Sequence, residues 1–422
     1  MKIFLVAFGS HGDVQPILSL GQGLRDAGYH VTLAAGMDFQ KHVERAGLIF
    51  TPIDVDIEGM MNTDIGKEWL DGSSHNPRTE LANMKRMAEE SADGINRSML
   101  RAVTEVDADV LISGLMTLPT IEAIGRTQNK RVIASWLTPF PLTRSGMAGM
   151  QAPLPGRYSI INRWAGYFIL SVFYSVFDKI TNQMHQQLGL PHFTRSDFIS
   201  LINQTPSVSG FSEQVVPRPA DWGPQHHITG YWHAPAPSDW EPSPALKAFL
   251  EAGDAPIYIG FGSMANKNPQ ATVAIMIEAL QKANKRGIIL SGWGGLKADD
   301  LPESIFSLDY APHSWLFPRM AGVIHHGGAG TTSAALRAGV PSMIVAHMGD
   351  QPYWGRRIKE LGVGAAPIRR HKLTVDTLAK GIIEMTSDPQ MRQRAADLGA
   401  RLQAEDGVAK AVATISQMLD RK

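Results

Sequence analysis

Short apolar runs alternate with helical patterns along most of the chain. In the first half, apolar runs at Ile3–Phe8, His30–Ala35 and Ile49–Pro52 are separated by segments with helical spacing, such as Val14–Ala27. Strand, helix and strand at this rhythm predict βαβ units and a parallel sheet covered by helices on both faces. The second half restarts the same alternation, with strands predicted at Pro256–Gly262, Gly287–Ser291, Ala321–Ile324 and Ser342–Val345.

A stretch rich in proline and tryptophan, residues 216–244, separates the two halves. Proline at this density disfavours both helices and central strands. Because free linkers are seldom so aromatic, we interpret the stretch as a structured connector that its tryptophans hold against a surface. Two α/β halves joined in this way predict a cleft between them, where ligands commonly bind.

The composition excludes several classes of protein. Of the 422 residues, 44% are hydrophobic and 19% are charged, which is ordinary for a globular protein and untypical of collagen-like, coiled-coil or disordered chains. Forty Lys and Arg balance 40 Asp and Glu, so no overall charge attracts nucleic acid or an anionic membrane. The chain has no Cys, which removes disulfides, thiolate nucleophiles and Cys-ligated metals.

The apolar runs also bear on location. The N-terminal run passes directly into Gly-Ser-His-Gly-Asp, which indicates a strand and its loop rather than a secretory signal. No run reaches the roughly 18–20 apolar residues that span a bilayer. We therefore expect a cytoplasmic protein. The most aromatic run, Trp164–Phe177, could line a pocket for an apolar acceptor or contact a membrane surface peripherally, but we favour a buried amphipathic helix.

The segment Val323–Thr332, VIHHGGAGTT, is the strongest indication of a binding site. A strand leads to two histidines, glycines let the backbone approach a ligand, and a helix then begins. Unpaired N–H groups and the positive end of the helix dipole form an anion site suited to a diphosphate. The alternative is a glycine-rich turn with packed histidines; a metal site is disfavoured, because adjacent strand residues point to opposite faces. The predicted ligand-binding residues are His325, Gly327, Gly328, Gly330 and Thr331.

Three further loops follow predicted strands. Asp350 and Gln351 pair a carboxylate with an amide, which suits sugar hydroxyls, although Asp-Gln before a helix is also an ordinary N-cap. His11 and Asp13 follow the first strand, and either could take a proton from a hydroxyl; the alternative is a loop histidine and an N-cap aspartate. A loop of small residues after another predicted strand includes Ser263. The segment 309–317 contains three aromatic rings, Tyr310, His313 and Trp315, which either stack on a base or belong to the core.

Several strings along nearly the whole chain resemble the family 1 glycosyltransferases of the GT-B fold, and among them most the sterol-glucosyltransferase branch. The matching strings are GSHGDVQP (9–16), SGFSEQVVPRPADW (209–222), HITGYWH (227–233), YIGFGSM (258–264), GIILSGWGGL (287–296), APHSWLFPRMAGVIHHGGAGTT (311–332) and GDQPYWGRR (349–357).

The resemblance implies an α/β protein with two Rossmann-like, doubly wound domains that face each other across a cleft. It also implies metal-independent transfer with inversion from a nucleotide sugar, usually UDP-glucose, without a cofactor. We accordingly predict an acceptor-binding domain, a connector, a donor-binding domain and a C-terminal helix that packs back on the first domain, at residues 1–215, 216–244, 245–405 and 406–422.

The resemblance also implies roles for individual residues. His325, Gly330 and Thr331 would contact the diphosphate, with Ser263 near the phosphates. The 310–315 stretch would contact the uracil, and Asp350 and Gln351 would hold the sugar. Asp13 would be the catalytic base. Many relatives have Arg where this chain has His11, so a base role for His11, alone or relayed to Asp13, stays open. Apolar acceptor-binding residues are predicted in the Met- and aromatic-rich middle of the first half: Trp136, Phe140, Met147, Trp164 and Phe168.

The predicted function is transfer of a hexose to a hydroxyl of an apolar acceptor such as a sterol, a lipid or a secondary metabolite. Two alternatives remain open. A non-hydrolysing nucleotide-sugar epimerase would form product from the donor alone. A non-catalytic nucleotide-sugar or lipid-binding homologue would bind the donor and release no UDP.

Overall fold

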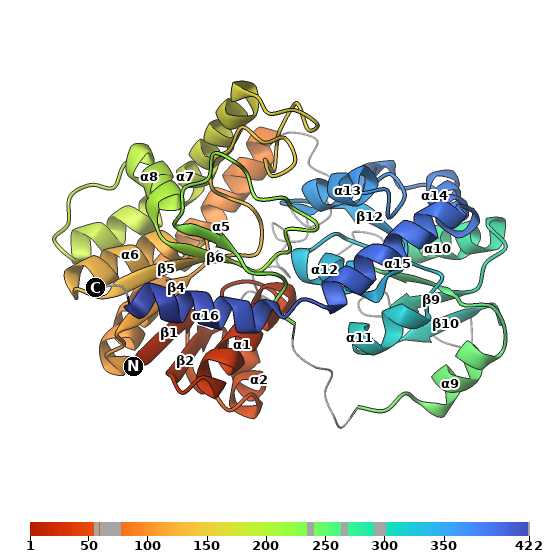
Figure 1. Cartoon of the computed structure of the whole chain (residues 1–422), viewed down its shortest axis with the longest axis horizontal. Helices are drawn as coiled ribbons and strands as arrows, with labels where there is room; N and C mark the ends of the chain where they lie inside the picture. The colour runs from red at the N-terminus through yellow and green to blue at the C-terminus, as the bar shows by residue number, and fades with distance from the viewer. Residues whose placement is uncertain (55–58, 60–76, 234–239, 263–268, 291–300, 421–422) are drawn as a thin grey trace. The chain divides into compact units, whose positions relative to one another are not determined.

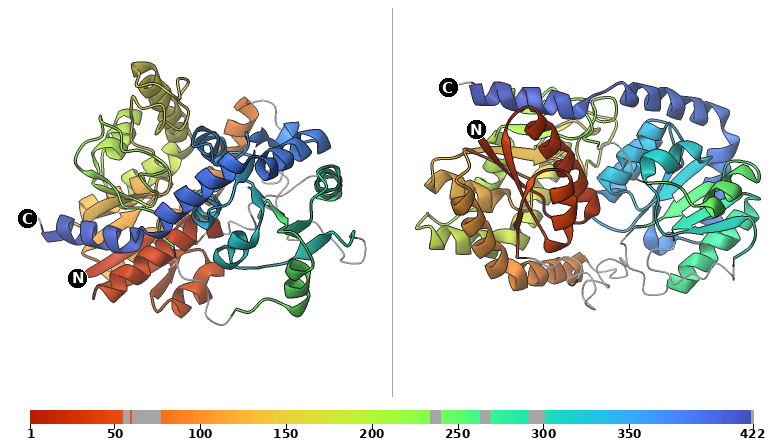
Figure 2. Two further views of the ribbon diagram at one scale, coloured as in Figure 1. Left: turned by 45° about the vertical axis from the view of Figure 1, so that its right-hand side comes forward. Right: turned by 90° about the horizontal axis from the view of Figure 1, so that it is seen from below.

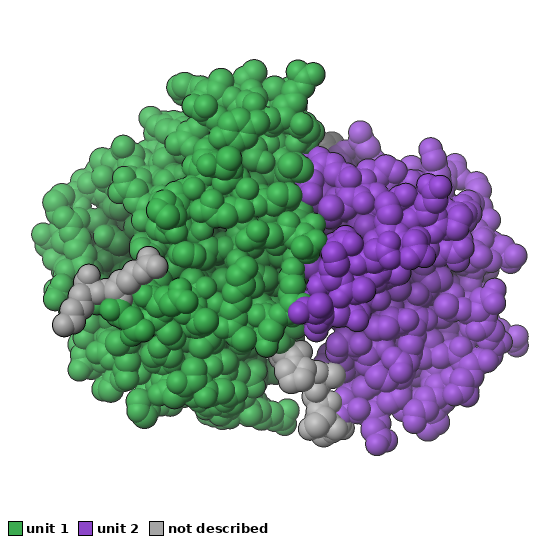
Figure 3. All heavy atoms as spheres, viewed as in Figure 1, with its two compact units in different colours: residues 1–60, 76–234, 405–422 green, residues 61–75, 235–404 purple. Residues whose placement is uncertain are grey.

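In the computed structural model of the chain, the residues described are 1–54, 59, 77–233, 240–262, 269–290 and 301–420. They form two compact units. Unit 1 comprises the described parts of residues 1–60, 76–234 and 405–422, and unit 2 comprises those of residues 235–404 (Figure 3). Each unit has its own parallel sheet and its own hydrophobic cores.

Unit 1 is built on a seven-stranded parallel sheet with the strand order β3-β2-β1-β4-β5-β6-β7. Parallel strands with helices on both faces are buried on both sides, which is why the strands read as continuous apolar runs. The strands are β1 (Lys2–Val6), β2 (His30–Ala35), β3 (Ile49–Pro52), β4 (Val110–Ser113), β5 (Arg131–Trp136), β6 (Ser207–Ser209) and β7 (His226–Ile228).

Helices cover the two faces of this sheet. Ile3 and Leu5 of β1 pack on one face with α1 and the C-terminal helix α16, which lie side by side (Figures 1 and 2). Phe4 and Val6 point to the other face and pack with α5, α6 and α7. The helices are α1 (His11–Asp26), the 3-10 turn η1 (Met37–Phe39), α2 (Gln40–Arg45), α5 (Pro77–Val106), α6 (Leu118–Thr127), α7 (Ile160–Gln187), α8 (Arg195–Gln204) and α16 (Gly407–Asp420).

Unit 2 holds a six-stranded sheet with the order β10-β9-β8-β11-β12-β13, again parallel. Its strands are β8 (Ile257–Gly260), β9 (Gly287–Leu290), β10 (Ile305–Leu308), β11 (Gly322–His325), β12 (Ser342–Ala346) and β13 (Ile368–Arg369). Its helices are α9 (Pro244–Glu251), α10 (Pro269–Lys282), α11 (His313–Leu316), η3 (Phe317–Arg319), α12 (Ala329–Ala338), α13 (Gln351–Glu360), η4 (Arg370–Lys372), α14 (Val375–Ser387) and α15 (Pro389–Gln403). The prediction of two doubly wound α/β halves is thus confirmed.

The strand orders place one topological switch point in each sheet. In unit 1 the chain turns from β1 to β2 on one side and returns to β4 on the other, so the switch point lies between β1 and β4. In unit 2 it lies between β8 and β11 for the same reason. Ligands of open α/β sheets bind at the carboxyl ends of the strands that flank such a point, so these two loop clusters are where a site is expected.

The proline-rich stretch contains a short strand that the sequence pattern did not predict. β7 pairs with β6 at the edge of the unit 1 sheet. An edge strand has a hydrogen-bonded neighbour on one side only, so it tolerates prolines nearby. Trp222 and Trp232 are 5% and 3% exposed, so these two tryptophans anchor the stretch in unit 1.

His226 of β7 is a buried histidine held in its neutral form. Its Nε2 donates to the carbonyl oxygen of Asn203 at 3.0 Å, and its Nδ1 lies 2.8 Å from the hydroxyl of Ser207, which must therefore donate to it. Burial lowers the pKa of His226 to about 4. The folded chain thus resists protonation at a site where the unfolded chain, with an ordinary histidine pKa near 6.5, accepts a proton readily.

We expect His226 to make the stability of unit 1 depend on pH. Its contribution is complete above about pH 6.5 and is lost as the pH falls toward 4, because the unfolded state binds the proton first; the loss reaches roughly 3 kcal/mol at pH 4. Urea unfolding at several pH values should show that His226→Gln, although less stable at pH 7, has a flatter dependence than the parent. An exposed histidine, His192, serves as the control. Equal slopes for the parent and His226→Gln would contradict the assignment.

The expectation that Trp164–Phe177 forms a buried amphipathic helix is wrong for the first half of that segment. Trp164 and Phe168 are each 66% exposed. The segment belongs to α7, a helix of 28 residues that is long and apolar enough to cross a membrane by length and composition alone. Its apolar 18-residue window is only 17% buried. Its second half is nevertheless core, since Val176, Ile180 and Met184 pack with α5 and α6.

Candidate active site

The glycine turn between β11 and α12 has the geometry of an anion site. β11 ends at the fully buried His325, and the ring Nδ1 accepts a hydrogen bond from the Gly327 N–H at 3.1 Å. Gly327 has φ +98°, and Gly328 is the N-cap of α12. The N–H groups of the first turn of a helix have no partner within it, and here that turn is half-exposed. These N–H groups and the helix dipole favour a phosphate at this position.

The hydrogen bonds at this edge of the sheet assign the tautomers of two buried histidines. His325 accepts at Nδ1, so its proton is on Nε2. His347, after β12, donates from Nδ1 to the carbonyl oxygen of Val345 at 2.9 Å, so its Nε2 is an acceptor. Both Nε2 atoms are buried without a hydrogen-bond partner within the described part of the chain.

These rings carry no positive charge near neutral pH. Burial, with smaller contributions from His326 and His313, holds the pKa of His325 well below its ordinary value. Burial also lowers the pKa of His326 to about 4 and that of His347 to about 3. The cluster therefore offers one neutral N–H donor and one neutral acceptor beside the helix terminus.

Three loops of unit 2 meet around this cluster. A Cβ added at Gly262, after β8, would lie 3.5 Å from the ring of His326. A Cβ added at Gly327 would lie 3.1 Å from the Cβ of Gln351 in the loop after β12. The rings of Phe261 and His347 are 5.4 Å apart. The structure thus brings the glycine turn and the Asp-Gln loop together at the switch point, whereas Ser263 lies outside the described residues.

Asp350 and Gln351 begin α13 and are held by different partners. Asp350 is the N-cap residue by position, and its Oδ2 accepts from the indole Nε1 of Trp354 at 2.8 Å. Gln351 is 6% exposed, and its Oε1 accepts from the backbone N–H groups of His347 and Met348 at 2.7 and 3.1 Å. The amide oxygen of Gln351 thus shapes the loop itself, and its –NH2 group carries the donors suited to a sugar hydroxyl.

The aromatic residues predicted to meet a base have different environments. Tyr310, between β10 and α11, is 60% exposed. The ring of His313 stacks on Phe317 with centroids 4.3 Å apart. The rings of Trp315 and Trp240 meet edge-on with their centroids 5.0 Å apart. The Cζ atom of Arg319 lies 4.1 Å from the centroid of the Trp315 ring. Of the three, Tyr310 presents the most open ring for stacking.

In unit 1, His11 and Asp13 lie at the start of α1, in the loop that leaves β1 at the switch point. Asp13 occupies the third helical position, and its Oδ2 accepts from the N–H and the hydroxyl of Ser10 at 2.8 and 3.0 Å. This is the capping role that the sequence left as an alternative to catalysis, with Ser10 rather than Asp13 as the N-cap. A Cβ at Gly9, which has φ +133°, would collide with the Asp13 carboxylate, so the loop requires a glycine there.

His11 belongs to a small group of rings at the same end of α1. Its ring stacks on Phe39 at 6.1 Å and meets His42 edge-on at 5.6 Å. Partial burial, and then the charge of His42, lower the pKa of His11, which favours the neutral imidazole that a proton acceptor needs. Both candidate bases, His11 and Asp13, thus lie within one turn of one helix, where each retains solvent-accessible surface.

The predicted acceptor-binding residues divide between core and surface. Trp136, at the end of β5, is fully buried, and its ring meets that of Phe140 edge-on with the centroids 5.7 Å apart. Phe140 is half-buried and also meets Phe173. Met147 is 41% exposed, and Trp164 and Phe168 are 66% exposed, so these three offer apolar surface.

Sequence reasoning assigned no role to His326 and His347. For His326 the available signal was its position next to His325, and for His347 it was the position directly after β12. Within the described ranges, no group of three or more His, Asp or Glu side chains is arranged to hold a metal ion.

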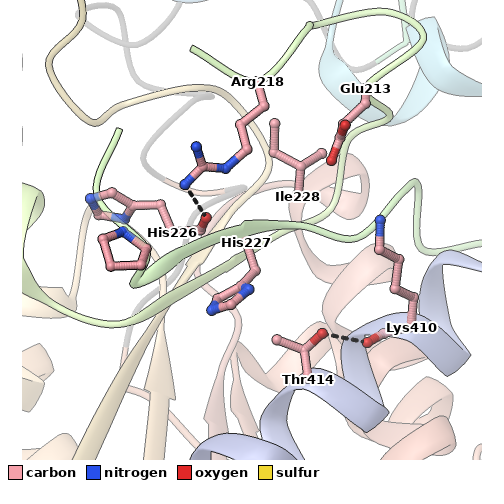
Figure 4. Close-up of a pocket in the computed structure, with 8 residues that line it drawn as sticks. Glu213, Arg218, His226, His227, Ile228, Lys410 and Thr414 are labelled. Atoms are coloured by element: carbon pink, nitrogen blue, oxygen red, sulfur yellow. Dashed lines mark hydrogen bonds between the residues drawn. The ribbon is translucent and has the colours of Figure 1, made fainter. Parts of the chain in front are cut away.

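A cavity of about 330 Å³ lies at the β7 edge of the unit 1 sheet, away from the switch point of that sheet (Figure 4). It is lined by residues of β7, the preceding loop and α16, and Arg218 there donates to the carbonyl oxygen of His226 at 3.4 Å. None of the predicted site residues contributes to its lining.

Two family profiles match the chain. The N-terminal domain of glycosyltransferase family 28 matches residues 3–135, and the C-terminal domain of erythromycin biosynthesis protein CIII-like proteins matches residues 289–418. A sterol 3-beta-glucosyltransferase of Arabidopsis thaliana is 33% identical over 98% of this chain and 67% of its own length. The O-mycaminosyltylonolide 6-deoxyallosyltransferase of Streptomyces fradiae is 30% identical over 100% of this chain and 98% of its own.

Other curated relatives are longer than this chain. It spans 64% of a second sterol 3-beta-glucosyltransferase of Arabidopsis thaliana and 30% of that of Aspergillus fumigatus, at 34% and 32% identity. Among solved structures, the calicheamicin glycosyltransferase CalG4 has a TM-score of 0.73 at 15% identity, covering 100% of this chain and 98% of that one. Glycosyltransferase VinC in complex with DTDP has a TM-score of 0.69 at 18% identity, with 100% of both chains covered.

Proposed function

Because this chain belongs to the GT-B glycosyltransferases that include the sterol 3-beta-glucosyltransferases, we propose that it transfers glucose from UDP-glucose to a hydroxyl of an apolar acceptor, such as a sterol or a secondary metabolite, with inversion and without a metal ion. The observation that carries the proposal is the glycine turn at Gly327, where a helix N-terminus and a buried neutral histidine adjoin and would favour an anion such as a diphosphate.

The donor would bind unit 2 at the glycine turn and the Asp-Gln loop, which lie side by side. The N–H groups at the start of α12 and the Nε2–H of His325 would receive the diphosphate, and Tyr310 would stack on the base. Asp350 and Gln351 would hold the sugar hydroxyls. The complex of VinC with DTDP supports a nucleoside diphosphate as the ligand, and the names of the relatives support a hexosyl group.

The chemical step would be a single displacement at the anomeric carbon. Asp13, or His11, takes the proton of the acceptor hydroxyl as its oxygen attacks, and the bond to the nucleoside diphosphate breaks on the opposite side, which inverts the configuration. The charge that develops on the departing diphosphate is stabilised by preoriented donors, each worth about 3 kcal/mol in comparable sites. These donors support the proposal that no metal ion is needed, because they can stabilise the charge on the departing diphosphate that a cation would otherwise neutralise.

The acceptor would bind unit 1. Phe140 and Met147 offer apolar surface for a ring system that carries one hydroxyl, whereas Trp164 and Phe168 lie on the exposed first half of α7. We further propose a cytoplasmic location, where nucleotide sugars are available, with peripheral contact to a membrane.

An assay of UDP release tests the reaction. We expect release from UDP-glucose only when a sterol or a macrolide aglycone is present, with equal rates in EDTA and in Mg²⁺, and a β-linked product by NMR. Donor panels with UDP-galactose and dTDP-glucose check the sugar and the base. Product from the donor alone would indicate the epimerase, donor binding without release under any acceptor would indicate a binding protein, and loss of activity in EDTA would overturn metal independence.

A further inference from the structure

The exposed large apolar side chains of unit 1 concentrate on one short segment. Tyr158, Ile160 and Ile161 are 54%, 47% and 52% exposed, and Trp164 and Phe168 are 66% exposed. Residues four apart lie on the same side of a helix, so Ile160, Trp164 and Phe168 form a stripe along α7. An amphipathic helix of a soluble domain faces its apolar stripe inward, whereas this one faces it outward. We name the five exposed residues Tyr158, Ile160, Ile161, Trp164 and Phe168 the apolar stripe.

The surroundings of the apolar stripe are basic. Between residues 144 and 177 the chain contains three arginines, Arg144, Arg157 and Arg163, and no acidic residue. The nearby Asp221 is 17% exposed and is engaged by the Thr143 hydroxyl and by Arg163. No ion pair of Arg157 is found among the described residues, and its side chain is exposed next to Tyr158. The chain as a whole has a formal net charge of zero, so this positive region is local.

The packing of α7 shows which kind of membrane contact is compatible with the fold. Its second half belongs to the core between α5, α6 and the sheet, through Val176, Ile180 and Met184. A helix anchored in this way cannot span a bilayer without unfolding unit 1. Its first half projects from the rest of unit 1, as the olive end of α7 in Figures 1 and 2 shows. Only an interfacial contact made by this projecting end is consistent with both halves.

We propose that the apolar stripe with Arg144 and Arg157 is a membrane-binding surface that inserts into the interface of an anionic phospholipid bilayer. Trp and Tyr side chains favour the boundary between headgroups and acyl chains, and Arg binds the lipid phosphates around it. Burial of apolar area and attraction to anionic lipids combine to hold such helices in the interfacial plane. A contact of this kind would place unit 1 where apolar alcohols are dissolved. It specifies the surface for the peripheral membrane contact of the proposed function, but it needs no donor and no reaction, so the two can fail separately.

Vesicle cosedimentation of the full chain, without nucleotide, tests the proposal. We expect binding to vesicles of phosphatidylcholine with 30 mol% phosphatidylserine, roughly tenfold weaker binding to phosphatidylcholine alone, and weakening of the former in about 0.5 M NaCl. The double variant Ile160→Gln/Ile161→Gln should lower partitioning about tenfold or more, because it removes two side chains that would leave water. Arg157→Gln should lower it about fivefold on anionic vesicles only.

Matched control variants distinguish binding by this surface from nonspecific adsorption of exposed apolar side chains. Ile49→Gln and Ile383→Gln change aliphatic side chains that are 61% and 46% exposed elsewhere in the chain and should leave partitioning unchanged. Circular dichroism and a thermal melt confirm that each variant folds. If the parent chain stays in the supernatant with anionic vesicles, or if the Ile160/Ile161 double variant sediments like the parent, the proposal is wrong, whatever the outcome of the transfer assay.

Discussion

Replacing Asp13 by Asn is expected to lower turnover by about two to four orders of magnitude and to leave UDP binding intact. Asn keeps the shape of the side chain and one oxygen that can accept from Ser10, so the start of α1 is retained. It cannot take the proton of an acceptor hydroxyl. Steady-state UDP release gives the turnover, and calorimetric titration with UDP gives the binding.

The control for Asp13→Asn is a change of charge on the same helix away from the switch point. Asp26 closes α1 and pairs with Arg25 at the surface, so Asp26→Asn should keep full activity. His11→Gln then decides how the two candidate bases share the step. Activity of Asp13→Asn close to that of the parent, with loss in His11→Gln, would transfer the role to His11; activity in both would remove this loop from the chemistry.

Replacing Gly327 by Ala is expected to abolish measurable binding of UDP and of the nucleotide sugar. The residue has φ +98°, where an L side chain costs about 1–2 kcal/mol. The added Cβ would also lie 2.6 Å from Ile344 and 3.1 Å from Gln351, so the turn must shift away from the Asp-Gln loop. Such a shift moves the backbone N–H groups that would meet the diphosphate. Calorimetric titration measures the affinity, and chemical unfolding measures the stability.

Gly28 separates backbone strain from the loss of the site. It has φ +92° in unit 1, and a Cβ there would meet nothing within 4 Å. Gly28→Ala should therefore lose about 1–2 kcal/mol of stability, as strain alone requires, with unchanged affinity for UDP. If Gly327→Ala binds UDP as tightly as Gly28→Ala does, the nucleoside diphosphate does not bind at this turn and the proposed donor site is wrong.

The sequence predicted the α/β architecture well because parallel strands leave a local signature. A strand buried on both faces is a continuous apolar run, and the alternation of Ile3 and Leu5 with Phe4 and Val6 supplies both cores of unit 1. Glycine-rich loops after β1 and β11 were also visible, since backbone approach and positive φ require glycine at Gly9 and Gly327. Both signals are encoded within a few residues, so no knowledge of distant contacts is needed to find them.

Other features depend on contacts between residues far apart in the chain, and only the tertiary structure decided them. Which helix face is covered is set by partners such as α5, so the pattern of α7 could not show that Trp164 and Phe168 lie outside the core. The tautomers of the histidines follow from backbone atoms positioned by the fold, and the approach of Gly327 to Gln351 follows from strand order. Local sequence determines backbone preference and apolar periodicity, whereas burial and proton position depend on neighbours that only the assembled sheet supplies.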